Sequence, residues 1–250
     1  MIAPYPTLRL ERTLWAAGDR VVVGMDEVGR GSWAGPVTVA AVVPGEEHLT
    51  GIRDSKMLTP PEREKAAAKV HRWARAIGVG HASYEECDLV GMTEAQRRAA
   101  YRALQQLAAQ GFEPDRIVLD GKFDYLSMPR VVRTVVKGDQ TVLSVAAASV
   151  VAKTTRDAIM VEESEHYPAY GFESNRGYPA PLHKCALAAY GPSAIHRRSW
   201  IFMDSVFGLY PGMMSSIGQA PPGFFDRASA RVAERFRYEP RQPPLPLVSS

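Results

Sequence analysis

The sequence predicts a layered α/β domain, and three observations lead to this fold class. Short β-branched runs, of which 21–25 and 37–43 are the clearest, alternate along the chain with longer segments of helical composition. Both runs are nearly continuous in apolar residues rather than alternating with polar ones, which favours strands that are buried on both faces. The chain has 250 residues, 46% of them hydrophobic, which is enough to bury a substantial core. Alternating strands and helices of this kind pack economically as a sheet flanked by helices.

The first half of the chain is expected to form three strands and two helices. Glycines between the first two apolar runs predict a hairpin-like pair of strands. Prolines and an acidic residue follow Thr59, so a helix is expected over about 59–76. A third strand is expected over 77–82. The Ala- and Arg-rich segment 93–110 predicts a second helix that stops at Gly111.

The second half is expected to add two strands, over 116–119 and 131–136, and two helices. The Ala-rich segment 143–165 is helical by propensity, and a short helix is expected over 181–190. The last part of the chain differs in character, because seven prolines fall within 211–250.

We therefore divide the chain into an N-terminal extension over 1–20, one globular domain over 21–208 and a Pro-rich tail over 209–250 that is expected to be flexible.

Composition excludes several classes of protein. The two cysteines, Cys87 and Cys185, supply neither a disulfide framework nor a Cys-rich zinc module and are typical of a reducing compartment. The sequence has no run of roughly 18 apolar residues and no secretory leader pattern, so we expect a cytoplasmic protein without a membrane span. The formal net charge of +3 neither identifies nor excludes a nucleic-acid binder.

Carboxylates fall at the ends of three predicted strands. Asp26 and Glu27 follow directly on the first strand, Asp120 follows the fourth, and Asp139 comes just after the fifth. In open α/β sheets, ligands bind beyond the strand ends, where such side chains can converge. Two carboxylates about 4 Å apart repel by roughly 4 kcal/mol at an effective dielectric constant near 20. Either one of them takes up a proton or a cation lies between them.

The ligand chemistry of these acids favours a hard cation. An all-oxygen set suits Mg²⁺ or Mn²⁺ and argues against zinc. Four acids around two such ions are typical of in-line phosphodiester hydrolysis. The structural alternative is that each aspartate forms a turn or caps a helix, as Asp120 before Gly121 would do.

Groups that could hold a polyanion accompany the acids. Arg30 lies between Gly29 and Gly31, where exposed backbone N–H groups could bind a phosphate or a sugar hydroxyl. Lys56 lies just before a predicted helix start, where N–H donors suit an anion. A simple glycine turn and ordinary helix capping are the structural alternatives.

Further candidates lie in the second half of the chain. Lys153 and Arg156 are three residues apart on one helical face, and Tyr178 offers an aromatic plane for a base or a sugar. A solvated helix face and a surface turn are the alternatives. His183 has no partner at zinc-ligand spacing and is expected to be structural, and the basic cluster 196–198 is expected to be solvent-exposed.

The order of these motifs resembles the signature of bacterial ribonuclease HII over about residues 21–208. The segments that carry the resemblance are Asp26–Gly31 with Gly35–Val37, Asp54–Lys56, Leu119–Gly121, Val136–Asp139, Ala146–Lys153, Thr155–Asp157, Tyr170–Phe172, Gly177–Pro179, His183, Gly191–Pro192 and His196–Ser199. The ordered set is far more specific than any single motif.

The resemblance implies a ribonuclease H-like fold, with a mixed five-stranded sheet flanked by helices and a small helical C-terminal extension. It also implies hydrolysis of the RNA strand of RNA–DNA hybrids with Mg²⁺ or Mn²⁺, two ions acting during catalysis. A further implied activity is incision 5′ of single ribonucleotides embedded in duplex DNA, which leaves 3′-hydroxyl and 5′-phosphate ends. The implied partners are those nucleic acids. We separately expect the protein to be a monomer.

The family's site residues transfer onto matching positions of this sequence. The catalytic and metal-binding carboxylates fall on Asp26, Glu27, Asp120 and Asp139. The loop that reads the junction falls on Gly29, Arg30 and Gly31, and the tyrosine that stacks on the neighbouring deoxyribose falls on Tyr178. Lys56, Lys153 and Arg156 are expected to hold phosphates without reading sequence.

Two further features, Asp157 and residues 242–247, are not assigned to the substrate-binding site. Asp157 belongs to a matching motif, but its place inside the predicted helix 143–165 favours a structural role. Residues 242–247 faintly resemble peptides that bind sliding clamps, although disordered filler is the favoured interpretation of this part of the tail.

Two other functions were weighed. Ribonuclease HIII has the same fold but usually carries an N-terminal substrate-binding domain, and only about 20 residues precede the first strand here. A catalytically silent nucleic-acid-binding module is the alternative from another class. The carboxylate set argues against it, because a pure binder gains nothing from placing acids against phosphate.

Overall fold

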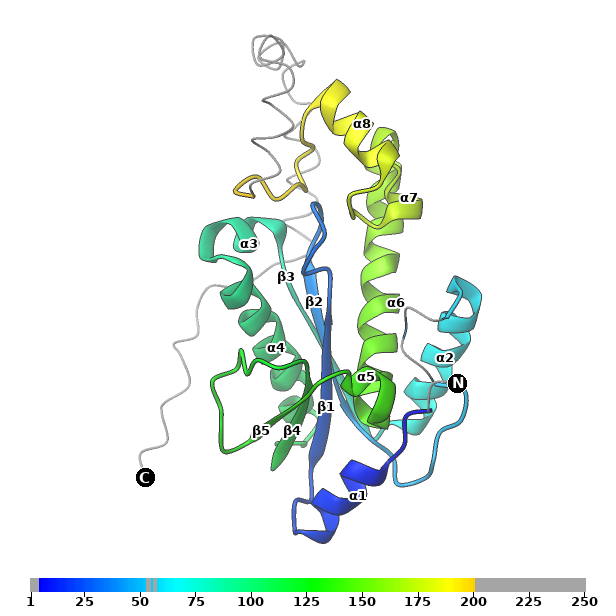
Figure 1. Ribbon diagram of the computed structural model, residues 1–250, viewed down its shortest axis with the longest axis vertical. Coiled ribbons are helices and arrows are strands. Elements are labelled where there is room, and N and C mark those ends of the chain that lie inside the picture. The colour runs from blue at the N-terminus through cyan, green and yellow to red at the C-terminus, as the bar shows by residue number, and fades with distance from the viewer. Residues whose placement is uncertain (1–4, 53–54, 56–57, 201–250) are drawn as a thin grey trace.

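One mixed five-stranded sheet forms the centre of the molecule, in the strand order β3–β2–β1–β4–β5 (Figure 1). The structure is a computed structural model that describes residues 5–52, 55 and 58–200. The strands are β1 Val22–Val28, β2 Val37–Val43, β3 Ala76–Ala82, β4 Arg116–Asp120 and β5 Val132–Val135. Strand β2 pairs antiparallel with both β1 and β3, whereas β1, β4 and β5 are parallel neighbours. The carboxyl ends of β1, β4 and β5 therefore meet at one edge of the sheet.

Helices cover both faces of this sheet (Figure 1). Helix α4, Met92–Ala109, packs against β2 and β3 on one face, and helix α6, Leu143–His166, lies along β1 and β2 on the other. Helix α2, Pro60–Trp73, packs on the outer side of α6. The predicted α/β class, with a mixed five-stranded sheet flanked by helices, is confirmed. No helix of the described residues is long and apolar enough to cross a membrane.

Shorter helices complete the molecule. They are α1 Arg9–Ala16, α3 Tyr84–Val90, α5 Gly138–Thr141, the 3₁₀ turn η2 Pro168–Tyr170, α7 Phe172–Asn175 and α8 Pro181–Tyr190. Around the C-terminal half of α6, side chains from η2, α7 and α8 form a separate apolar cluster that includes Tyr170, Phe172 and Leu187. This cluster is the small helical C-terminal part that the resemblance implied.

The apolar runs form strands because both of their faces are covered. All seven residues of β2 are buried, as are the first five of β1. Val23 and Met25 point into the cluster beneath α4, whereas alternate residues of β1 point toward α6. At Gly24 the helix lies directly on the strand: a Cβ there would come within 2.3 Å of the Ser144 backbone. Only glycine allows α6 to pack this closely on β1.

Four α-helices of the described residues, α1, α3, α5 and α7, and the 3₁₀ turn η2 were not predicted. Helix α1 lies within residues 1–20, which were expected to be an extension, yet Leu14 is buried against β1 and β4 and the Glu11 carboxylate accepts a hydrogen bond from Ser144 N at 2.8 Å. Helix α3 begins at a capping box between Ser83 and Glu86, a sequence signal that the prediction did not use. The tail, 209–250, lies outside the described residues.

Candidate active site

Three carboxylates converge at the edge where the parallel strands end. Asp26 lies near the end of β1, Asp120 ends β4, and Asp139 lies in α5; oxygen atoms of all three side chains lie within 4.8 Å of one another. Strands β1 and β4 pair in parallel with Met25 opposite Leu119, so the residues after this pair are neighbours. The sequence prediction that acids at separate strand ends meet in one place therefore holds for these three.

The path of the chain after β5 brings Asp139 to this edge. Lys137 adopts a left-handed backbone conformation with φ of 55°, which turns the chain from the strand into α5. Gly138 N then donates a hydrogen bond of 2.7 Å to Asp120 Oδ1, so the two segments are joined beside the carboxylates. Asp139 lies just after the strand, as expected, but in the first turn of a short helix that was not predicted, and its side chain is buried.

Asp26 is the acid with the most strongly perturbed ionisation. Its side chain is buried, and burial raises its pKa well above the usual value, with the charges of Glu27 and Asp120 adding to the effect. Hydrogen bonds from the Ser149 side chain and from Glu27 N, the latter at 2.8 Å, act in the opposite direction. Such a site favours either a proton or a cation. Because every donor in the group is a carboxylate oxygen, the residues fit a hard divalent ion such as Mg²⁺ or Mn²⁺.

Glu27 differs from the other predicted acids in its position. It follows Asp26 on β1, and successive side chains of a strand point to opposite faces. It is not a member of the group of three carboxylates, although its charge raises the pKa of Asp26. Its role as a metal ligand stays a prediction.

The segment after β1 contains the Gly-Arg-Gly sequence and leads to β2; residues 29–36 are called the glycine loop below. Gly29 has φ of +89°, and a Cβ there would lie 2.2 Å from Arg156 Nε, so glycine is required. Gly29 N donates a hydrogen bond of 3.1 Å to the Tyr178 hydroxyl. The Arg30 guanidinium donates to the buried Gln96 side chain of α4. Gln96 is a positioning contact that sequence reasoning missed, because nothing local marks it.

Arg156 was predicted to hold phosphates, and the structure gives it a different task. The side chain is fully buried, and burial lowers the pKa of Arg156 to about 10. Its guanidinium donates four hydrogen bonds inside the protein, to Pro36 O at 2.8 Å, Arg176 O at 2.9 Å, Ser32 Oγ at 2.6 Å and Ala34 O at 3.0 Å. Arg156 thus anchors the glycine loop, and the phosphate prediction is corrected.

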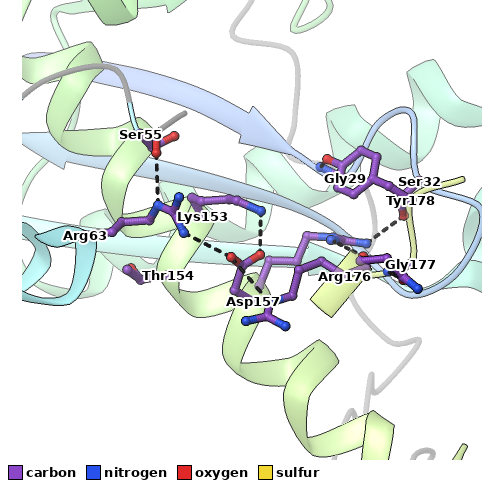
Figure 2. Close-up of polar contacts among 12 residues, drawn as sticks. Gly29, Ser32, Ser55, Arg63, Lys153, Thr154, Asp157, Arg176, Gly177 and Tyr178 are labelled. Carbon is purple, nitrogen blue, oxygen red and sulfur yellow. Dashed lines mark hydrogen bonds and ion pairs between the residues drawn. The ribbon is translucent and has the colours of Figure 1, made fainter. Parts of the chain in front are cut away.

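Lys153 lies one turn before Arg156 and is partly exposed. Figure 2 shows its ammonium group beside the Asp157 carboxylate, to which it donates a bond of 2.6 Å. Asp157 also pairs with Arg63 at 3.2 Å and with Arg176 at 3.5 Å. Three cations thus share one acid, consistent with the structural role expected for Asp157. Lys56 lies outside the described residues.

The basic cluster 196–198 was expected to be exposed, and only its last member is. His196 and Arg197 are fully buried. Arg197 donates hydrogen bonds to Arg30 O at 3.0 Å and to Gly35 O, which places a second buried arginine under the glycine loop. The burial of Arg197 was not predicted because its partners come from a loop more than 150 residues earlier in the chain. The His196 ring is buried against His183 and Ser193.

The fold and the carboxylate group together define a metal-dependent nuclease built on a ribonuclease H-type sheet. Comparison with known proteins gives the particular family. The family model for ribonuclease HII matches residues 23–203, and the chain belongs to that family. Ribonuclease HII proteins are metal-dependent endoribonucleases that act on the RNA strand of RNA–DNA hybrids.

Individual relatives agree with this assignment. Ribonuclease HII of Streptomyces avermitilis is 49% identical over 207 residues, which are 81% of this chain and 88% of that protein. Among solved structures, ribonuclease H2 from Pyrococcus horikoshii OT3 superimposes with a TM-score of 0.63 at 27% identity, covering 76% of this chain and 99% of that one. A PCNA–ribonuclease HII complex from Archaeoglobus fulgidus has a TM-score of 0.61 at 24% identity, covering 74% and 96%, respectively.

The comparisons also decide between the functions weighed from sequence. The resemblance to bacterial ribonuclease HII is confirmed, and membership of an enzyme family together with the group of three carboxylates favours an enzyme over a catalytically silent binding module.

Proposed function

We propose that this enzyme, besides cutting the RNA strand of hybrids, incises duplex DNA 5′ of a single embedded ribonucleotide and leaves 3′-hydroxyl and 5′-phosphate ends. The observation that carries the proposal is the hydrogen bond between Gly29 N and the Tyr178 hydroxyl. It holds an aromatic ring beside the glycine loop, three residues after Asp26.

The proposed centre uses the carboxylates of the sheet edge. Asp26, Asp120 and Asp139 would hold the ions, with Glu27 as the fourth acid. Two Mg²⁺ or Mn²⁺ ions held there would supply the activation of a water and the stabilisation of charge on the leaving 3′ oxygen. Ser149 and Glu27 N would orient the Asp26 carboxylate, because both hydrogen-bond to it.

Discrimination between RNA and DNA would come from the 2′-hydroxyl, the group that separates them at the cut site. The backbone of Gly29–Gly31 would contact that hydroxyl, and Arg30 would be held in place by Gln96. The Tyr178 ring would stack on the sugar that follows the ribonucleotide. A deoxyribose on the 3′ side of the ribonucleotide lacks the 2′-hydroxyl and would let the ring approach closely, whereas a second ribose would not. The ring would therefore favour a ribonucleotide that is followed by DNA.

Lys153 would bind a backbone phosphate without reading sequence. Its surroundings support this role, because Lys153, Arg63 and Arg176 give three positive charges against the one carboxylate of Asp157. An approaching phosphate would balance that excess. We further propose that the enzyme acts as a monomer. Binding of residues 242–247 to a sliding clamp stays a prediction, since that segment lies outside the described residues.

The proposal is tested with an end-labelled duplex that contains one ribonucleotide. Incubation with Mn²⁺, and separately with Mg²⁺, should give one incision 5′ of the ribonucleotide, and the product should be extended by a polymerase because it ends in a 3′-hydroxyl. The same duplex without the ribonucleotide, and a reaction with chelator, are the controls. Cleavage of a continuous hybrid without any incision of the single-ribonucleotide duplex would overturn the proposal.

Tyr178→Ala should reduce incision at the single ribonucleotide by about 10- to 100-fold, because stacking on an aromatic ring contributes about 1–3 kcal/mol. Metal affinity, followed by the Mn²⁺ dependence of the rate, should not change. Tyr190→Ala is the matched control, since Tyr190 is 68% exposed at the end of α8. Normal incision by Tyr178→Ala would show that the ring does not contact the substrate.

A further inference from the structure

Two histidines that the proposed mechanism does not use lie buried behind Tyr178. His183 in α8 and His196 in the segment after it are both fully buried, and their Nε2 atoms are 2.8 Å apart. Aromatic rings enclose the pair: Phe172 lies 5.3 Å from His183 and 5.8 Å from His196 between ring centroids, and Tyr170 lies 5.0 Å from His196. A polar pair in such a setting is stable only if its hydrogen bonds are satisfied.

The outer nitrogens of the pair determine where the protons lie. His196 Nδ1 is 2.9 Å from Ser193 N, and a backbone N–H only donates, so this Nδ1 carries no proton. His183 Nδ1 is 2.8 Å from Tyr178 O, and a carbonyl only accepts, so this Nδ1 carries the proton. His196 Nε2–H must then donate to His183 Nε2. The contacts with Ser193 N and with Tyr178 O therefore require the same direction for the hydrogen bond between the two Nε2 atoms, and each ring carries one proton and is neutral.

A second proton on either ring would disrupt this pattern. On His196 Nδ1 it would face Ser193 N–H and leave only the Ser193 hydroxyl, 2.8 Å away, to accept it, and on His183 Nε2 it would face the N–H of His196. Burial lowers the pKa of both histidines, and for His196 the charges of His183 and Arg198 lower it further. The pair is thus fixed in one orientation and one protonation state.

This hydrogen-bonded chain connects Tyr178 to the glycine loop from behind. Residues on either side of His196 bind the loop: Gly35 N donates to Ile195 O at 2.9 Å, and Arg197 N donates to Trp33 O at 2.9 Å. At the front, the Tyr178 hydroxyl accepts from Gly29 N. The main chain of Tyr178 and its hydroxyl are therefore both tied to the same loop, through the histidine pair on one side and through Gly29 on the other.

We propose that the His183–His196 pair is a positioning element that fixes Tyr178 against the glycine loop and thereby sets the preference for a single embedded ribonucleotide over a continuous hybrid. The inference rests on the proposed function, in which Tyr178 contacts the sugar after the ribonucleotide. Neither histidine touches the substrate. They act by holding the ring at the distance from the loop that one ribose and the next deoxyribose require.

The protonation pattern is tested on the unaltered enzyme. Long-range ¹H–¹⁵N spectra of protein labelled at histidine nitrogens should show one ring protonated at Nδ1 and a second at Nε2, both neutral from about pH 8 to about pH 5.5, where free histidine becomes charged. Assignment comes from the loss of each signal in His183→Phe and His196→Phe. Either ring titrating in this range, or both rings in the same tautomer, would overturn the proposal.

The kinetic test uses His183→Phe, which keeps a ring against Phe172 and removes both polar contacts. The ratio of kcat/KM on the single-ribonucleotide duplex to kcat/KM on a continuous hybrid should fall about tenfold, the size expected for a lost buried hydrogen bond. In a Tyr178→Ala background the same substitution should cause no further fall, because its effect passes through Tyr178. Phe172→Leu is the matched control: it loosens the packing of both histidines without removing a hydrogen bond, so stability should fall while the ratio stays.

The outcomes separate the two proposals. If the unaltered enzyme cuts hybrids but not the single-ribonucleotide duplex, the proposed function fails. If it cuts both and His183→Phe lowers both rates equally, or lowers the ratio again in the Tyr178→Ala background, only the positioning role fails. Should His183→Phe not fold, Ser193→Ala replaces it, since it removes one contact to His196 Nδ1 at 2.8 Å. An unchanged ratio in that variant would also overturn the positioning role.

Discussion

The carboxylate group and the anchored glycine loop are built in opposite ways, although both lie along helix α6. At the first, three acids meet with few compensating donors, and the pKa of Asp26 rises because its charge is buried beside other negative charges. At the second, Arg156 and Arg197 are buried and form no ion pair with a carboxylate of the described residues, but their N–H groups donate to loop carbonyls.

The difference shows what each region contributes. The carboxylate group lowers the stability of the metal-free fold, and a bound cation would offset that cost. The arginine contacts stabilise one conformation of the loop and need no ligand. Charge substitutions should therefore have opposite effects on stability in the two regions, which gives the following experiments their order, from the largest expected effect to the smallest.

Asp26→Asn should lower hybrid cleavage by at least about 10³-fold, or about 4 kcal/mol in activation free energy, while duplex binding is retained. The metal-free protein should melt at a higher temperature than the unaltered one. A raised folded-state pKa means that ionisation of Asp26 costs stability as pH rises above the unfolded pKa, and the amide removes that cost at neutral pH. Activity assays and thermal melts in chelator measure the two effects.

The control for this experiment is Asp115→Asn, the same substitution at an exposed position. Hydrogen bonds from Val21 N and Arg20 N lower the pKa of Asp115, so its charge stabilises the fold. Cleavage should stay at the level of the unaltered enzyme. Turnover at that level in Asp26→Asn with Mg²⁺ would refute the assignment of the carboxylate centre.

Arg156→Met should act in the opposite direction and lower the free energy of unfolding by about 3 kcal/mol or more. The substitution leaves the carbonyls of Pro36 and Arg176 without their side-chain donor, whereas Ala34 O keeps the bond from the Ser32 hydroxyl; each buried carbonyl that loses its donor costs about 1–3 kcal/mol. Chemical denaturation measures the change. Arg198→Met, at an exposed arginine, should alter stability by no more than about 0.5 kcal/mol. Equal effects of the two substitutions would remove the contrast drawn above.

Lys153→Met should have the smallest effect, a change in the salt dependence of duplex binding. It tests whether the lysine binds substrate or only supports the structure around Asp157. If Lys153 binds one phosphate, the slope of log affinity against log salt should decrease by about 0.9. Binding is measured with Asp26→Asn as the background, so that the duplex stays intact. Lys65→Met, on the exposed side of α2, should leave the slope unchanged. An unchanged slope in Lys153→Met would show that the lysine binds no phosphate and serves only in the ion pair with Asp157.

The sequence predicted the features that depend on local pattern. The apolar runs became β1 and β2, the Ala-rich segment became α6, and Pro181 marked the start of α8. The ends of β1 and β4 carried Asp26 and Asp120 to one edge, and the segment after β5 carried Asp139 there, because parallel strands share a carboxyl end. In these cases the information needed lies within a few residues of each position.

The sequence could not predict features that depend on distant partners. Lys153 and Arg156 look alike in the sequence, one turn apart on a helix, yet one is partly exposed and the other is fully buried. The difference arises from carbonyls at 34, 36 and 176, which the fold brings to Arg156 and not to Lys153. In the same way, His183 had no visible partner, because His196 reaches it only after the chain has turned past the end of α8.

Helix α6 also sets the spacing between the carboxylate group and the glycine loop. Ser149, which touches Asp26, and Arg156, which holds the glycine loop, are seven residues apart in one uninterrupted helix of 24 residues. Seven residues make nearly two full turns and rise by about 10 Å, so both side chains leave the same side of the rod. Inserting one residue between them would swing one of these side chains by about 100°, and no neighbouring loop could restore both contacts at once.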